Sequence, residues 1–336
     1  MNIIDIHTHG IGGFDTRSST AEDILRIAEA HGALGVSEIV LSIYPAPIET
    51  MRQQMELVRQ AMEIQGPGSL QDAALSRVQG LEKTRSDSEP PDSAVRPPTT
   101  RDDPRSVEVS GPRTLDPGPG RQAHILGVHL EGPFLNPAQC GALDPTSLIN
   151  PGEHASHELL DGFEHLVKMI TVAPERQGAL AFIRNVTELG IVVSMGHSDA
   201  TYAEAEAGFQ AGARGITHLF NGMRAFHHRE PGLAGFGLLN KDLYVEVLAD
   251  PFHLHIRTLE LIFKTKKPEK IILVSDSVRE TKTVSDGRIV DALGRLQGGA
   301  MAVTQSAQRL IHQGFDESTV TNAITVNPRQ YLMLDV

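Results

Sequence analysis

Residues 3–9 read Ile-Ile-Asp-Ile-His-Thr-His, a short apolar run that ends in two histidines. Similar short runs recur along the chain at 38–44, 125–131, 166–173, 191–197, 215–218, 244–249 and 271–276. Amphipathic stretches typical of helices lie between several of them, at 20–32, 47–64, 175–189, 201–212 and 256–264. Near-continuous apolar strands that alternate with helices are typical of parallel sheets covered on both faces. The eight runs therefore predict a (β/α)8 barrel of the TIM type, with an open doubly wound sheet as the structural alternative.

The bulk composition of the chain narrows its class. Its 336 residues suffice for one large domain, and single barrels of about 250 residues are common. A net charge of −12 argues against a nucleic-acid or anionic-membrane surface. The single cysteine, Cys140, excludes an internal disulfide and fits a reducing compartment. Because no secretory signal and no run of about eighteen apolar residues is visible, we expect a cytoplasmic protein without a membrane segment.

One segment, at about 66–122, does not fit the barrel pattern. It contains nine of the 20 prolines and has neither an aromatic residue nor a histidine. Such a composition buries too little apolar surface to offset the entropy of ordering the chain. We therefore expect one barrel domain over 1–336, interrupted by a flexible insertion with a short helix at 70–81. A regulatory or docking arm is the minority alternative.

Polar residues end several of the predicted strands. His7 and His9 are two residues apart and so share one face of the first strand. Four more strands end in a residue that can bind metal or protons: Glu131, His197, His218 and Asp276. The carboxyl ends of the strands meet at one mouth of a (β/α)8 barrel, where catalytic groups lie. Each residue alone fits a satisfied polar group at a strand edge, but the whole set indicates a functional site.

Imidazole and carboxylate side chains are ligands for a divalent metal such as Zn, Fe or Mn. Glu131, His197 and His218 could hold one ion. His7 and His9, with Asp276 and a bridging Glu131, could hold a second, so we expect one or two ions per subunit. Such an ion acidifies water and polarises a carbonyl. Asp276 could then take the proton of that water and deliver it to a leaving amine.

The chain resembles the amidohydrolase superfamily and, within it, the N-acetylglucosamine-6-phosphate deacetylases. The similarity runs from end to end apart from the insertion, and its matching stretches stand in one order. They are His-Thr-His-Gly at 7–10, His-Leu-Glu-Gly-Pro-Phe-Leu-Asn at 129–136, Thr-Val-Ala-Pro-Glu at 171–175, Gly-His-Ser-Asp-Ala-Thr at 196–201, Thr-His-Leu-Phe-Asn-Gly-Met at 217–223, Arg-Glu-Pro-Gly-Leu-Ala-Gly at 229–235 and Ser-Asp at 275–276. The combination is far more specific than any single motif.

The resemblance implies a metal-dependent deacetylase that converts N-acetylglucosamine 6-phosphate to glucosamine 6-phosphate and acetate. It implies that Glu131, His197 and His218 bind the central metal and that Asp276 is the catalytic aspartate. A substrate-contacting histidine, which could also serve as the base, falls on His253. The implied sugar contacts are Ala142, Leu143, Asn221, Gly222, Leu296, Gln297 and Gly298.

The implied phosphate-binding arginine is Arg229, whose guanidinium can bind phosphate oxygens in pairs. Without the resemblance, a surface ion pair with Glu230 would be the better interpretation. The neighbours His227 and His228 fit a solvated loop pair. His129 faces the same side as Glu131 and is expected to lie behind the metal site rather than in it.

Two departures from the family keep alternatives open. The family's small β-sandwich, built from both chain ends, is expected to be absent here. Leu143 stands where some members have a polar residue that contacts the substrate. The alternatives are an amidohydrolase of another N-acyl sugar, a cyclic amide or a phosphoester, and a non-catalytic truncated homologue. An adenosine-deaminase-like enzyme is disfavoured by the stretches at 129–136 and 229–232, and a homodimer is the assembly that we keep open.

Overall fold

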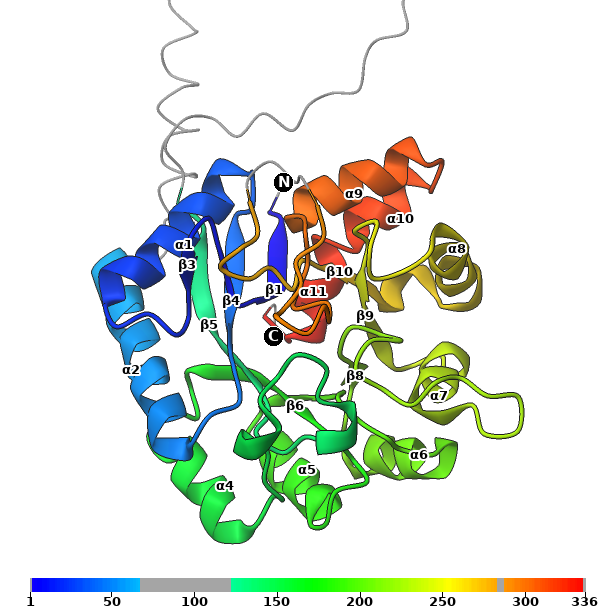
Figure 1. Cartoon of the computed structure of the whole chain (residues 1–336), viewed down its shortest axis with the longest axis horizontal. Coiled ribbons are helices and arrows are strands. Elements are labelled where there is room, and N and C mark those ends of the chain that lie inside the picture. The colour runs from blue at the N-terminus through cyan, green and yellow to red at the C-terminus, as the bar shows by residue number, and fades with distance from the viewer. Residues whose placement is uncertain (1, 67–121, 283–286, 335–336) are drawn as a thin grey trace, which may run out of the picture. The chain divides into compact units, whose positions relative to one another are not determined.

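The computed structural model of this chain describes residues 2–66, 122–282 and 287–334, and it forms a parallel barrel (Figure 1). The eight strands are β1 (Ile4–Thr8), β4 (Glu38–Ile43), β5 (His124–Glu131), β6 (Val167–Val172), β7 (Val192–Met195), β8 (Gly215–Ile216), β9 (Tyr244–Leu248) and β10 (Ile271–Val274). They neighbour one another in chain order. β10 meets β1 through the Asp276 amide, which donates to the His7 carbonyl at 2.8 Å, and the His9 amide, which donates to the Ser277 carbonyl at 2.8 Å. This order rules out the doubly wound sheet and confirms the predicted (β/α)8 barrel.

Helices surround the strands in Figure 1. They are α1 (Ala21–Ala33), α2 (Ile48–Gln65), α4 (Glu153–Leu160), α5 (Ala179–Glu188), α6 (Tyr202–Ala211), α7 (Gly232–Leu239), α8 (Ile256–Thr265), α9 (Val303–His312), α10 (Glu317–Asn322) and α11 (Val326–Tyr331). Short elements complete the order: β2 (Gly10–Ile11), β3 (Phe14–Asp15), η1 (Pro137–Gln139), η2 (Pro145–Ser147) and η3 (Pro268–Lys270). None of the described helices is long and apolar enough to span a membrane. The predicted helix at 70–81 and nearly all of the 66–122 segment lie outside the described residues.

One predicted helix boundary was wrong. The sequence pattern placed a helix over 175–189, whereas α5 begins at Ala179. Gly178 precedes it with a φ of 87°, in the left-handed region, which a continuous helix does not allow. The side chain of Glu175 is instead used by neighbouring loops, as described below.

The strands bury both faces, as their near-continuous apolar sequences predict. Ile39 and Leu41 of β4 pack with helix residues such as Ile24, in the cluster between barrel and helices. Val40, which points the other way, belongs to a second cluster of strand residues that also contains Tyr331. Since alternate residues of a strand face opposite sides, this second cluster fills the barrel interior.

The amino end of the barrel is closed by the last helix. The Tyr331 ring of α11 lies 4.9 Å from the Tyr244 ring, centroid to centroid, and is fully buried. Any side chain at position 215 would collide with this ring, so Gly215 leaves the space that Tyr331 occupies. The opposite, carboxyl end of the strands carries the candidate site.

Candidate active site

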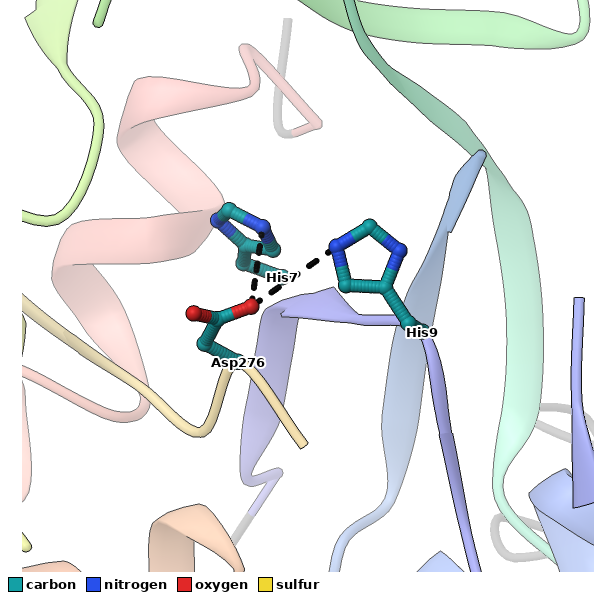
Figure 2. Close-up of side chains that lie close together, drawn as sticks. All are labelled: His7, His9 and Asp276. Atoms are coloured by element: carbon teal, nitrogen blue, oxygen red, sulfur yellow. Dashed lines mark ion pairs between the residues drawn. The ribbon is translucent and has the colours of Figure 1, made fainter. Parts of the chain in front are cut away.

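Six side chains from five strand ends form two groups at the carboxyl mouth of the barrel. His7, His9 and Asp276 form one group, and Glu131, His197 and His218 form the other. Within each group the candidate ligand atoms lie within 4.8 Å of one another. Figure 2 shows both rings of the first group directed at the Asp276 carboxylate, with Oδ1 lying 3.4 Å from His7 Nε2 and 3.7 Å from His9 Nε2.

Glu131 joins the two groups. Its Oε1 lies 3.1 Å from Nε2 of both His197 and His218, and its Oε2 lies 3.1 Å from Nε2 of His9. Burial would raise the pKa of this carboxyl, but His197, with hydrogen bonds from His218 and His9, holds it well below its usual range. Glu131 is therefore an ionised carboxylate with one oxygen toward each group, which is the arrangement of a bridging ligand.

Backbone carbonyls orient three of the four histidines. The Nδ1–H groups of His9, His197 and His218 donate to the carbonyls of Ser42, Gln139 and Asn221, at 3.0, 2.9 and 3.2 Å. A carbonyl can only accept, so each Nδ1 carries a proton, and the Nε2 atom that faces the centre is the one that would bind a metal. This is the orientation that metal-ligating histidines need.

His7 shows how a proton and a metal would compete. Its Nε2 is buried and makes no hydrogen bond among the described residues. Burial disfavours its charge, but Asp276, Glu246 and Glu131 together raise the pKa of His7 to about 10. A divalent ion would have to displace that proton, and would then meet the same carboxylates. The nitrogen and carboxylate donors, with no thiolate among them, fit a Zn, Fe or Mn ion.

The backbone is strained at three of these positions. His197, His218 and Asp276 have φ values of 45°, 30° and 47°, in the left-handed region. Residues with a side chain rarely adopt this conformation, and such strain concentrates at functional sites. All three follow the end of a barrel strand. The left-handed conformation therefore changes the direction of the side chain at the point where the chain leaves the sheet.

A pocket lies over the two groups. It is lined by His9, Tyr44, Glu131, Gly141, Ala142, Leu143, His197, His218, Asn221, Gly222, Leu248, His253, Asp276, Leu296, Gln297 and Gly298. Every predicted substrate-binding residue except Arg229, the predicted phosphate ligand, is in this set. Gly222 also has a positive φ, and a side chain there would collide with the His197 ring. The structure thus places the predicted contacts directly above the candidate ligands.

Comparison with known proteins places this site in context. No protein-family model matches the chain. An N-acetylgalactosamine-6-phosphate deacetylase of Escherichia coli O157:H7 is 26% identical over 99% of the chain and 77% of the relative. An N-acetylglucosamine-6-phosphate deacetylase of Vibrio furnissii is 31% identical over 83% of the chain and 56% of the relative. A mutant of the Mycobacterium smegmatis N-acetyl-D-glucosamine-6-phosphate deacetylase, solved with N-acetyl-D-glucosamine-6-phosphate, superposes with a TM-score of 0.76 at 26% identity, covering 99% of this chain and 77% of that one.

The chain resembles the N-acetylglucosamine-6-phosphate deacetylases in sequence and in fold. It nevertheless spans only 40% to 57% of the length of several curated members that it matches.

Glu175 connects two loops that follow strands of the barrel. Its Oε1 accepts from the Asn136 side chain at 2.9 Å and from the Asp199 amide at 2.7 Å. Its Oε2 accepts from the Ser198 hydroxyl at 2.7 Å. Glu175 therefore ties the loop after Glu131 to the loop after His197. The sequence pattern placed Glu175 in a helix and did not predict this role.

His253 lies in the pocket wall, held by a buried carboxylate. Asp250 Oδ2 lies 2.8 Å from His253 Nδ1 and also accepts from the Ala300 amide at 3.0 Å. Burial opposes the charge of His253, but Asp250 and Asp276 raise its pKa. His253 is therefore biased toward the protonated form. The link to Ala300 also fixes the loop that carries Leu296, Gln297 and Gly298.

Arg229 is the one predicted substrate-binding residue that does not line the pocket. It is exposed, and its guanidinium lies 3.0 Å from the His228 ring. Arg229 and Glu230 form no ion pair among the described residues, and Glu230 accepts instead from the Tyr202 and Gly232 amides.

Among the remaining histidines, His129 lies behind the site. Its ring nitrogens contact the Ser42 and Thr171 hydroxyls at 3.0 and 2.7 Å, so neither is free to bind a metal.

Two residues near the site were not predicted from the sequence. Tyr44 stacks on the His9 ring with centroids 3.8 Å apart, and Glu246 lies 3.1 Å from His7 Nδ1. Tyr44 follows an apolar strand and Glu246 lies inside another, so their sequence context is that of ordinary barrel residues. Their roles depend on which strands meet in space.

Proposed function

We propose that this chain is a metal-dependent deacetylase that hydrolyses the N-acetyl amide of an amino sugar 6-phosphate. The observation that carries the proposal is the pair of ligand groups sharing Glu131, directly below the residues predicted to contact the sugar. N-Acetylglucosamine 6-phosphate is the proposed substrate, with glucosamine 6-phosphate and acetate as products.

In this proposal Glu131, His197 and His218 hold one divalent ion, and His7, His9 and Asp276 hold a second. Such an ion supplies Lewis acidity, which polarises the amide carbonyl and makes water more acidic. The four histidines bind the ions through Nε2, because each Nδ1–H donates a hydrogen bond to a fixed acceptor.

Asp276 carries the proton in this proposal. Its side chain is 15% exposed and lines the pocket, so it faces both the ligand groups and the substrate space. The attacking water gives one proton to the Asp276 carboxylate as its oxygen bonds to the acetyl carbon. The carboxyl then gives that proton to the sugar nitrogen as the carbon–nitrogen bond breaks, which yields acetate and the amine.

Recognition of the phosphate is proposed to use His253 and Arg229. In the described part of the chain, the pocket wall contains no lysine and no arginine, so His253 is its cationic candidate apart from the ligand histidines. Arg229 is proposed from the family resemblance, although it lies outside the pocket wall. A phosphate monoester carries close to two negative charges, so a local cation is needed in so acidic a chain.

A second candidate substrate is N-acetylgalactosamine 6-phosphate, which differs in the orientation of one hydroxyl. It is favoured by the name of the Escherichia coli relative, whose similarity covers 99% of this chain.

Acetate release tests the proposal directly. The purified chain, loaded with Zn²⁺ or Mn²⁺, is given both sugar phosphates and unphosphorylated N-acetylglucosamine, with Asp276→Asn as the matched control. We expect acetate from a phosphorylated sugar, little from the unphosphorylated one and almost none from the variant. A metal-loaded chain that releases no acetate from either sugar phosphate would overturn the proposal.

A further inference from the structure

Glu246 is a carboxylate in the barrel wall that the proposed reaction does not use. It lies in the middle of β9, is 1% exposed, and places Oε2 3.1 Å from His7 Nδ1. Its other oxygen, Oε1, is buried and has no hydrogen-bond partner among the described residues. A buried carboxylate with a single partner is costly, so a compensating cation is expected close to it.

No lysine or arginine supplies that cation, since His7 is the ion-pair partner found for Glu246 within the described ranges. His7 Nε2, on the far side of the same ring, points toward Asp276 and Glu131 at 3.4 and 3.5 Å. The imidazole thus connects the buried carboxylate to the His7, His9 and Asp276 group.

The other three ligand histidines lack this feature. His9, His197 and His218 are each oriented by a backbone carbonyl, which is neutral. A carboxylate behind an imidazole fixes its tautomer, as a carbonyl does, and also makes it a stronger donor. The two ligand groups therefore differ in the charge that lies behind them.

We propose that Glu246 is the positioning residue of the His7 group, and that metal binding there depends on it while binding at Glu131, His197 and His218 does not. This inference rests on the metal centre of the proposed function. Glu246 does not touch the substrate or the reacting atoms, and its effect passes through His7.

Metal binding, rather than activity, tests this inference. The chain and its variants are stripped of metal, titrated with Zn²⁺ in competition with a chromophoric chelator, and analysed for zinc per chain. We expect two zinc ions in the parent chain. Glu246→Leu should raise one of the two zinc dissociation constants by roughly 10–100-fold and leave the other unchanged. Glu246→Gln keeps an acceptor oxygen but loses the charge, so its loss should be smaller.

Glu38→Gln is the matched control. Glu38 is also a buried barrel glutamate, but it lies at the start of β4 and pairs with Arg329 at 2.7 Å. This variant removes a buried charge of the same kind and should keep both zinc constants. If Glu246→Leu fails to fold, the isosteric Glu246→Gln decides the question by the same titration.

Two outcomes would overturn the inference: unchanged zinc constants in both Glu246 variants, or a parent chain that binds one zinc at saturation. An equal weakening of both sites would do so as well, because the effect would not be specific to His7. A parent chain that binds two zinc ions but releases no acetate would instead remove the proposed function and leave this inference standing.

Discussion

The two ends of the barrel are built from the same eight strands but differ in how their buried polar groups are paired. At the amino end, the Tyr331 ring fills the space inside the barrel. Glu38 pairs there with Arg329, and the Asn327 side chain donates to the Pro268 and Ile271 carbonyls at 2.8 and 2.7 Å. Glu38 and Asn327 are both buried. The Glu38 carboxylate pairs with a cation, and the Asn327 amide donates to acceptors.

At the carboxyl end, the Nε2 atoms of the histidines face carboxylates and one another. The ligand atoms of Glu131, His197 and His218 converge, and the two histidine nitrogens lie 3.1 Å apart. Nitrogen and carboxylate donors that converge in this way favour a bound cation, and two of these residues are also held in left-handed backbone conformations. The amino end thus pairs Glu38 and Asn327 within the protein, whereas the carboxyl end is arranged for a ligand. Substitutions at the two ends should therefore have different consequences.

The largest effect is expected from His197→Ala. This change removes one Nε2 donor from the group that contains Glu131, so most bound metal and nearly all turnover should be lost while the fold persists. Metal analysis, acetate release and circular dichroism measure the three quantities. Full metal content together with full turnover would show that the carboxyl end is not a metal site.

Asp276→Asn should keep the ion held by Glu131, His197 and His218 and remove the proton carrier. The side chain keeps nearly the same size, so kcat should fall by about 10²–10⁴-fold with a modest change in KM. Steady-state kinetics at several substrate concentrations check this. An unchanged kcat would indicate that another group, with His253 as the first candidate, is the base.

Tyr331→Ala probes the opposite end and should affect stability alone. Loss of a large, fully buried ring should lower the free energy of unfolding by about 3–5 kcal/mol. Urea denaturation measures this, while kcat and KM of the folded fraction should stay as in the parent. A large change in KM without destabilisation would contradict the division between the two ends.

Arg229→Ala sharpens the comparison at the rim of the carboxyl end. Charge-assisted hydrogen bonds contribute about 1.5–3 kcal/mol, so kcat/KM should fall roughly ten- to a hundredfold for a sugar phosphate and hardly at all for the unphosphorylated sugar. Kinetics on both substrates separate a lost contact from a folding defect. Equal losses on both substrates, or no loss on either, would remove Arg229 from phosphate binding.

The smallest effect concerns Asp250, a carboxylate of the carboxyl end whose hydrogen bonds are satisfied. Burial opposes its ionisation, but His253 and the Ala300 and His253 amides lower its pKa from 3.8 to about 2. Because the folded-state pKa is depressed, the stabilisation is present above about pH 4 and is lost as the pH falls toward 2. Asp250→Asn should therefore destabilise the chain by about 2 kcal/mol at neutral pH, and the difference should shrink over that window. Denaturation curves at pH 7 and pH 3 measure this, and a pH-independent difference would contradict it.

Much of this molecule follows from local sequence. The eight strands could be predicted because a strand buried on both faces reads as an apolar run, and their order follows from the preference of βα units for neighbouring positions. The candidate ligands could be selected because parallel strands bring their carboxyl ends to one mouth. His7, His9, Glu131, His197, His218 and Asp276 all stand at such ends, so their meeting needed no knowledge of individual contacts.

The tertiary structure decided what lies between those elements. Glu246 is 239 residues from His7, and only closure of the barrel across its interior places one behind the other. Tyr44 and Glu175 act through loops that no local pattern orders, while Arg229 lies on a loop whose direction takes it away from the pocket wall. Strand identity and strand-end position are encoded over a few residues by side-chain periodicity. Contacts across the barrel depend instead on register and loop conformation, which the whole packed chain determines.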